Sequence, residues 1–336
     1  MNLPALAVGL VVDGRVAEVV AVPDAVLWRM ARRAQARALE RGVRGSCRAE
    51  IRLLPRRGLP GVAAGVEVRV AGEGGVFLAE LPTAALEPLL LSSAADLRAA
   101  AELPDDAVIS YLVLRSQENP DAPVWQKTLP AFLAAPAGLT PGRALFADRA
   151  WAEDVPIVIA EEVLHQCAEL CRDDAVERGG ALLGRVCFGE RDGAGGRLWV
   201  QVMAFAPAVG AEADAAHLIF NAEAWRSIQR TRTAVEAGLE PGQALQVVGW
   251  VHGHPRLSEA RDSALFLSAQ DVATTAQHFA EPFACALVLD AEAEASTSLE
   301  DSLIVFGWDQ YGISLAPRGL DLFDGRAARD LKENRR

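Results

Sequence analysis

Short runs of apolar residues, separated by glycine-containing turns, mark the first 130 residues. Two such runs flank Asp13-Gly14-Arg15, and two more flank Gly72-Glu73-Gly74-Gly75. Glycine tolerates the positive φ that tight turns need, so each pattern predicts a β-hairpin. The expected elements are strands over Leu6–Val12, Val16–Val22, Val66–Val70, Val76–Leu81 and Val108–Leu114, and helices over Ala25–Arg41 and Thr83–Leu103. The pattern predicts a mixed α/β domain, and it contains no chemical motif.

The segment Ala134–Gly142 (AAPAGLTPG) is small, uncharged and rich in Pro and Gly, which predicts a linker. Longer apolar strands and amphipathic helices follow it. The expected strands are Pro156–Ala160, Ala181–Phe188, Leu198–Phe205, Gln246–His252, Ala284–Asp290 and Leu303–Trp308, and the expected helices are Glu161–Val176, Ala222–Ala237 and Ser268–Phe279. We therefore expect an N-terminal α/β domain over 1–133, a linker over 134–150, a second α/β domain over 151–317 and a charged tail over 318–336.

Composition limits the class of protein and its partners. A chain of 336 residues with 51% apolar and 23% charged residues is typical of a globular protein with about two domains. The apolar stretch Leu3–Val12 lacks a positive flank and is too short to span a bilayer, so we expect a cytoplasmic protein without a membrane partner. The net charge of −12 argues against a nucleic-acid partner, which would need a basic face.

The cysteines show no disulfide-framework spacing. Their number is odd, which favours reduced thiols. Cys167 and Cys171, with His165, could form a second zinc site, but their spacing matches the apolar stripe of a helix, and buried thiols are the commoner outcome. The five cysteines are Cys47, Cys167, Cys171, Cys187 and Cys285.

The segment Val247–Asp271 carries the chemistry. His252 and His254 lie two residues apart at the end of an apolar strand, so both imidazoles point to the same face. Asp271 lies in the first turn of the next expected helix. Two histidines and one carboxylate are a known zinc ligand set, and three protein ligands leave a fourth position for water, as in catalytic zinc sites. The sequence predicts one Zn²⁺ per chain.

Two further residues complete a hydrolytic site. A zinc hydrolase needs a general base, and Glu177 is the candidate because it lies where a helix ends and an apolar strand begins. Ser268, three residues before Asp271, could offer its hydroxyl to a developing oxyanion.

These residues follow the signature E … HxHP … SxxD of the JAMM metalloproteases, which the second half of the chain resembles. The stretch ERGGALLGRV (Glu177–Val186) is similar to the family's helix-to-strand junction, and the elements from Pro156 to Pro317 follow the family's order. Two features depart from the pattern: Gly253 stands where many members have Ser, and the spacing from Pro255 to Ser268 is several residues longer than usual.

The resemblance implies a cytidine-deaminase-like JAMM (MPN) domain with a mixed sheet flanked by helices. It implies that His252, His254 and Asp271 are zinc ligands, that Glu177 is the acid/base and that Ser268 is the oxyanion donor. The implied activity is a zinc-dependent isopeptidase or peptidase that releases or matures a bacterial ubiquitin-like protein, some relatives serving antiphage conjugation systems. Its partners would be ubiquitin-like conjugates and ubiquitin-activating or conjugating-type enzymes. Two alternatives remain open: a peptidase that trims a sulfur-carrier protein, and a metal-free MPN scaffold.

Overall fold

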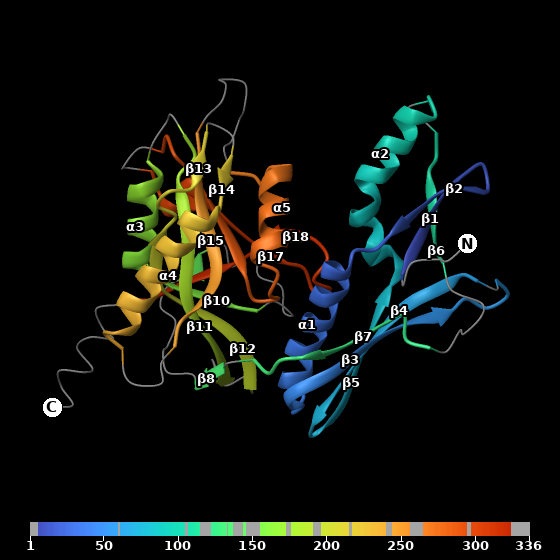
Figure 1. Ribbon diagram of the computed structural model, residues 1–336, viewed down its shortest axis with the longest axis horizontal. Coiled ribbons are helices and arrows are strands. Elements are labelled where there is room, and N and C mark those ends of the chain that lie inside the picture. Colours follow the sequence, from blue (N-terminus) through green and yellow to red (C-terminus); the bar gives the residue numbers. More distant parts are fainter. Residues whose placement is uncertain are drawn as a thin grey trace. The chain divides into compact units, whose positions relative to one another are not determined.

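A computed structural model of the chain contains two compact units. One contains Met1–Phe132 and Asp309–Ser314, and the other contains Leu133–Trp308 and Leu315–Arg336 (Figure 1). The structure describes residues 6–59, 61–104, 107–114, 122–132, 134–136, 144–145, 155–172, 176–190, 196–214, 217–239, 244–255, 265–293 and 297–323. None of the helices in these ranges is long and apolar enough to cross a membrane.

The first unit is built from two antiparallel sheets and helices, which confirms the mixed α/β class. Strands β1 (Ala7–Val12), β2 (Arg15–Ala21) and β6 (Ser110–Leu114) form one sheet in the order β2-β1-β6. The other sheet has the order β5-β4-β3-β7, from β3 (Arg44–Pro55), β4 (Ala63–Glu73), β5 (Gly75–Pro82) and β7 (Trp125–Leu129). The helices are α1 (Asp24–Glu40), the 3₁₀ helix η1 (Thr83–Leu90) and α2 (Leu91–Ala100).

Local turn chemistry explains the first hairpin. Asp13 and Gly14 have φ values of 49° and 74°, which matches the two-residue turns that favour Asp-Gly. Both predicted hairpins are therefore present, as β1–β2 and β4–β5. The apolar pattern does not predict β3, although this strand lies between β4 and β7 in the sheet. Its three arginines and one glutamate interrupt the apolar pattern, so the strand is recognised only from its pairing with β4 and β7.

The second unit contains a ten-stranded mixed sheet. Its order is β18-β17-β16-β15-β11-β12-β10-β19-β9, and β8 pairs with β11 off this path. The strands are β8 (Ala134–Pro136), β9 (Ala144–Leu145), β10 (Ile157–Ala160), β11 (Gly179–Glu190), β12 (Gly196–Pro207), β15 (Gln246–His254), β16 (Cys285–Asp290), β17 (Leu303–Trp308), β18 (Leu315–Pro317) and β19 (Leu320–Phe323). A separate hairpin joins β13 (Glu212–Ala213) to β14 (Leu218–Ile219).

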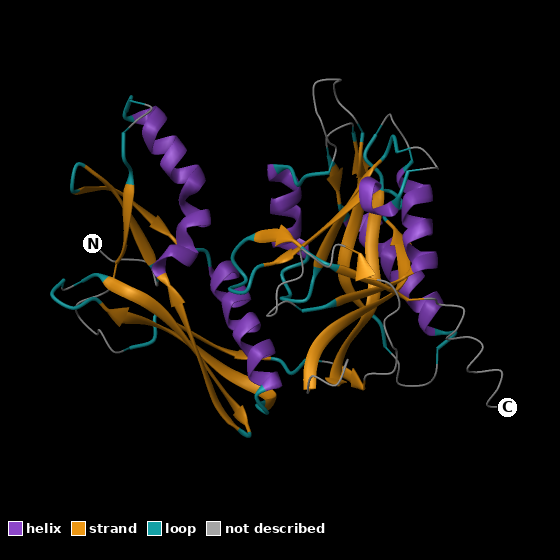
Figure 2. Cartoon of the chain, turned by 180° about the vertical axis from the view of Figure 1, so that it is seen from behind, coloured by secondary structure: helices purple, strands orange, loops and turns teal. Residues whose placement is uncertain are grey.

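Helices cover both faces of this sheet. The helices are α3 (Glu161–Cys171), α4 (Ala222–Glu236), α5 (Ala269–His278) and α6 (Leu299–Ser302). Trp250 of β15 donates a hydrogen bond to Thr275 of α5, whereas a Cβ on Gly253, three residues further along the strand, would meet Cys171 of α3. Alternate residues of β15 thus face different helices, and α3 and α5 lie on opposite sides of the sheet, as Figures 1 and 2 both show.

The boundaries of the units differ from those expected. The range 134–150, expected to be a linker, supplies β8 and β9, which pair with β11 and β19. The range 318–336, expected to be a tail, supplies β19, which pairs with β10. The segment Asp309–Ser314 belongs to the first unit, where the guanidinium of Arg29 donates to the carbonyl of Gly312. These pairings join residues distant in sequence, so local composition does not reveal them.

All five cysteines are free and buried, which confirms the expectation of unpaired thiols. Cys167 and Cys171 lie on the buried stripe of α3, and His165 on the same helix is exposed. Burial raises the pKa of the Cys171 thiol to about 12, so this side chain is an inert packing group.

Candidate metal centre

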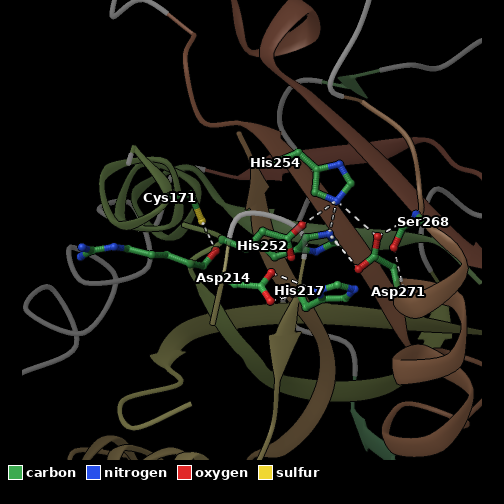
Figure 3. Close-up of polar contacts among 9 residues, drawn as sticks. Cys171, Asp214, His217, His252, His254, Ser268 and Asp271 are labelled. Atoms are coloured by element: carbon green, nitrogen blue, oxygen red, sulfur yellow. Dashed lines mark hydrogen bonds and ion pairs between the residues drawn. The ribbon is translucent and has the colours of Figure 1, made fainter. Parts of the chain in front are cut away.

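The central strand β15 carries the two histidines. It lies between β11 and β16, and every residue from Val248 to His254 is buried. The exposed fractions of His252 and His254 are 0% and 4%. Their rings point to the same side of the sheet, as the period of two predicts, and their Nε2 atoms are 2.9 Å apart (Figure 3).

Gly253, between the histidines, points to the opposite face. A Cβ on this residue would lie 2.8 Å from both the Cβ and the carbonyl oxygen of Cys171, at the end of α3. Such a distance is far shorter than a normal contact, so only glycine fits here without a shift of the helix. This packing explains why glycine stands between the two histidines.

Asp271 is held by the first turn of α5. Ser268 is the N-cap of this helix: the amide of Asp271 donates to Ser268 Oγ at 3.1 Å, and the amide of Ser268 donates to Asp271 Oδ2 at 2.7 Å. This reciprocal pair is a capping box in which Asp takes the place usually held by Glu. The S-x-x-D spacing therefore has a structural cause, because it fixes the carboxylate in the direction of the histidines.

Glu177 comes shortly before β11 and is 3% exposed. Its amide donates to the carbonyl of Asp214 at 2.7 Å. The residue after Glu177 is Arg178, whose carbonyl accepts hydrogen bonds from the amide of Gly253 at 2.9 Å and from the thiol of Cys171 at 3.2 Å. The backbone beside Glu177 is thus tied to the strand that carries the histidines.

The structure brings the four predicted groups together. Oδ1 of Asp271 lies 3.3 Å from Nε2 of His252, and Oδ2 lies 3.2 Å from Nε2 of His254. Oε1 of Glu177 lies 3.6 Å from Nε2 of His254. One ligand atom from each of the four residues lies within 4.8 Å of the others, and all four residues are buried.

These distances fit a tetrahedral metal ion. Ligands at about 2.0–2.1 Å from a tetrahedral zinc lie about 3.3 Å from one another. The two Nε2 atoms are 2.9 Å apart, and each lies 3.2–3.3 Å from a different oxygen of Asp271, Oδ1 for His252 and Oδ2 for His254. Oε2 of Glu177 is buried and has no hydrogen-bond partner within the described part of the chain. This oxygen can therefore still accept a hydrogen bond. A buried Glu/His/His/Asp group of this kind could bind a metal ion.

Burial and charge shift the pKa values of the site in different directions. Burial raises the pKa of Glu177 to about 7, although the nearby His254 opposes the shift. Burial lowers the pKa of His252. Burial alone would raise the pKa of Asp271, but hydrogen bonds with His252, His254 and Ser268 outweigh it and hold the pKa below its ordinary value. At neutral pH these shifts favour a neutral His252 and an ionised Asp271, the forms in which the two side chains bind metal.

Sequence reasoning missed the groups that surround these residues. Trp250 stacks on the ring of His252, with the ring centroids 4.3 Å apart and the planes at 8°. Phe266 makes an edge contact with His254 at 4.8 Å. The sequence offers one signal for Trp250: it lies two residues before His252 in a strand and so shares its face.

The remaining histidine near the site is His217. It lies in the β13–β14 hairpin and is exposed, and its Nδ1 lies 3.0 Å from Oδ1 of Asp214 (Figure 3). His278, at the end of α5, is partly buried and packs against Phe220 and Trp225. Of the extended loop Arg256–Leu267, residues 256–264 lie outside the described ranges.

Comparison with models of known protein families finds no match, and a comparison with curated proteins finds none either. The assignment of a function therefore rests on the residues and on their geometry.

Proposed function

We propose that the protein is a zinc-dependent hydrolase of peptide or isopeptide bonds, with the JAMM fold in its second unit. The observation that carries the proposal is the convergence of Glu177, His252, His254 and Asp271, whose ligand atoms lie within 4.8 Å of one another in a buried position. His252, His254 and Asp271 would hold the ion. The coincidence of this geometry with the E … HxHP … SxxD signature supports the family resemblance.

When bound, zinc would polarise the scissile carbonyl and lower the pKa of a water molecule toward neutrality. Glu177 would accept a proton from this water and deliver it to the nitrogen of the leaving amine as the carbon–nitrogen bond breaks. Its pKa of about 7 suits both steps, because a proton acceptor and donor works best when its pKa is close to the ambient pH.

Ser268 would donate a hydrogen bond from its hydroxyl to the developing oxyanion. Its Oγ already accepts the amide of Asp271, which fixes the oxygen beside the ligand carboxylate and leaves the hydroxyl hydrogen available. A preorganised donor of this kind stabilises the transition state more than the ground state. Ser268 would thus both cap helix α5 and stabilise the oxyanion.

The substrate class follows from the family resemblance. We propose that the natural substrate is the C-terminal tail of a ubiquitin-like protein, either conjugated to a target or extended as a precursor. The first unit would then bind the modifier, its target or a conjugation enzyme. Its described residues contain no second group of His, Cys, Asp or Glu close enough to hold a metal ion, in keeping with a recognition role.

The test combines metal analysis with hydrolysis of defined probes. The purified chain should contain about one zinc per molecule, and it should cleave peptides that end in Gly-Gly linked through an amide to a fluorescent amine. Chelation should abolish cleavage and added zinc should restore it. Zinc-free protein after expression in zinc-supplemented medium would favour the metal-free scaffold, and cleavage that persists in chelator would refute the mechanism.

A further inference from the structure

Trp250 contacts both elements that carry the candidate metal ligands. Its ring lies parallel to that of His252, with the centroids 4.3 Å apart and the planes at 8°, and parallel to that of Phe279, at 5.8 Å and 7°. Trp250 and His252 are each 0% exposed. The imidazole of His252 is therefore buried against an aromatic ring that also stacks with Phe279.

This contact takes the place of a hydrogen bond that metal-binding histidines usually have. Such histidines almost always donate their second ring N–H to a carboxylate, a carbonyl or a water, and this bond sets the orientation of the ring. Nδ1 of His252 is buried and has no hydrogen-bond partner within the described ranges. In the described structure, the ring of His252 is thus oriented by its stack on Trp250 and by the contacts of Nε2 with His254 and Asp271.

The indole of Trp250 also reaches the helix that carries Asp271. Its Nε1 donates to Oγ1 of Thr275 at 3.0 Å, and this hydroxyl donates to the carbonyl of Asp271 at 2.7 Å. Thr275 is 0% exposed, so both bonds are protected from water. The two bonds form a continuous link from β15 to the first turns of α5.

We propose that Trp250 and Thr275 are positioning residues of the metal centre, an inference that rests on the proposed function. Trp250 sets the ring plane of His252 through the stack, and Thr275 sets the distance between α5 and β15 through the two hydrogen bonds. One side chain thereby couples a histidine ligand on a strand to a carboxylate ligand on a helix. Loss of either contact should loosen the ligand set before the metal binds, and affinity should fall.

The proposal is tested by zinc affinity, measured on the full-length protein by competition with a chromogenic chelator. Trp250→Leu should bind zinc about 10- to 100-fold more weakly, the usual effect of removing an outer contact of a ligand. Trp250→Phe keeps a ring for the stack and should lose less affinity. Thr275→Val should weaken binding because it removes both hydrogen bonds, and Thr275→Ser should restore near-native affinity because it keeps the hydroxyl.

Trp199 provides the matched control. It is 1% exposed, lies in β12 of the same sheet and has no hydrogen-bond partner for Nε1 in the described ranges. Trp199→Leu should leave zinc affinity unchanged. Zinc should also alter tryptophan emission in the native chain and in Trp199→Phe, but much less in Trp250→Phe, because Trp250 is stacked on a ligand.

The outcomes separate this inference from the proposed function. A native chain that binds no zinc would overturn the metal centre and this inference with it. Equal zinc affinity of the native chain and Trp250→Leu would overturn this inference alone. An equal loss of zinc affinity in Trp250→Leu and Trp199→Leu would do the same. If Trp250→Leu does not fold, the Thr275→Val and Thr275→Ser pair decides: equal affinity in the two variants would refute the positioning role.

Discussion

Substitution of Glu177 by Gln should stabilise the metal-free protein, although it should slow turnover by the zinc-loaded protein. The carboxyl of Glu177 is 3% exposed, and burial raises its pKa from 4.5 to about 7. Each pH unit of such a difference corresponds to about 1.4 kcal/mol, so the ionised side chain destabilises the folded state by about 3 kcal/mol. Gln is nearly isosteric with Glu and cannot ionise, so the variant lacks this destabilisation.

The stability difference between the native protein and Glu177→Gln depends on pH in a defined direction. Below pH 4.5, Glu177 is protonated in both the folded and the unfolded chain, and its burial carries no electrostatic penalty. As the pH rises from 4.5 to about 7, the unfolded chain releases this proton more readily than the folded chain, so stability is lost. Above that pH the full difference of about 3 kcal/mol is present.

Urea unfolding of chelator-treated native and Glu177→Gln proteins between pH 4.5 and 8 measures this difference directly. Other titrating groups are common to both proteins, so their contributions largely cancel. The variant should match the native protein at the acidic end and exceed it by about 3 kcal/mol at pH 8, a melting-temperature gain of about 6–12 °C for a unit of this size. A difference that does not change with pH would refute the burial of an ionisable Glu177.

The same variant separates metal binding from chemistry. Glu177→Gln should retain zinc, because the three proposed ligands, His252, His254 and Asp271, are unchanged. Its turnover of an amide probe should fall by about 10²–10⁴-fold. Near-native turnover by this variant, with zinc content verified, would assign the proton transfer to another residue and would undermine the proposed mechanism.

Three further substitutions test the ligand set and its supports. His252→Ala should lose both zinc and turnover, measured by metal analysis and probe hydrolysis, and one retained zinc per chain would contradict the ligand assignment. Ser268→Ala should cost about 1 kcal/mol of unfolding free energy through loss of the N-cap and should lower turnover more than zinc content; unchanged stability in urea would argue against the capping box. Gly253→Ala should destabilise the protein by about 1–3 kcal/mol, because its Cβ would lie 2.8 Å from Cys171. A melting temperature equal to the native value would show that α3 shifts to accommodate the added methyl group.

Features that depend on neighbouring residues are determined by the amino-acid sequence alone. The turn at Asp13-Gly14 follows from positive φ, and the shared face of His252 and His254 follows from the period of a strand. The spacing from Ser268 to Asp271 is also local, since it forms a cap within one helical turn. In each case the interacting groups lie within a few residues, so the chain has few other ways to arrange them.

Contacts between distant segments were decided only by the tertiary structure. The strands β8, β9 and β19 are two to four residues long, too short to show a hydrophobic period, and they exist only through their partners in the sheet. The approach of Glu177 to His254 depends on β11 pairing with β15, a strand far along the chain, and the need for glycine at 253 depends on where α3 ends. The stack of Trp250 on His252 is local, but its link through Thr275 to Asp271 requires α5 to dock on the strand. Sequence spacing specifies on which face of a strand or helix a residue lies. Packing across the sheet decides which residues of other elements contact that face.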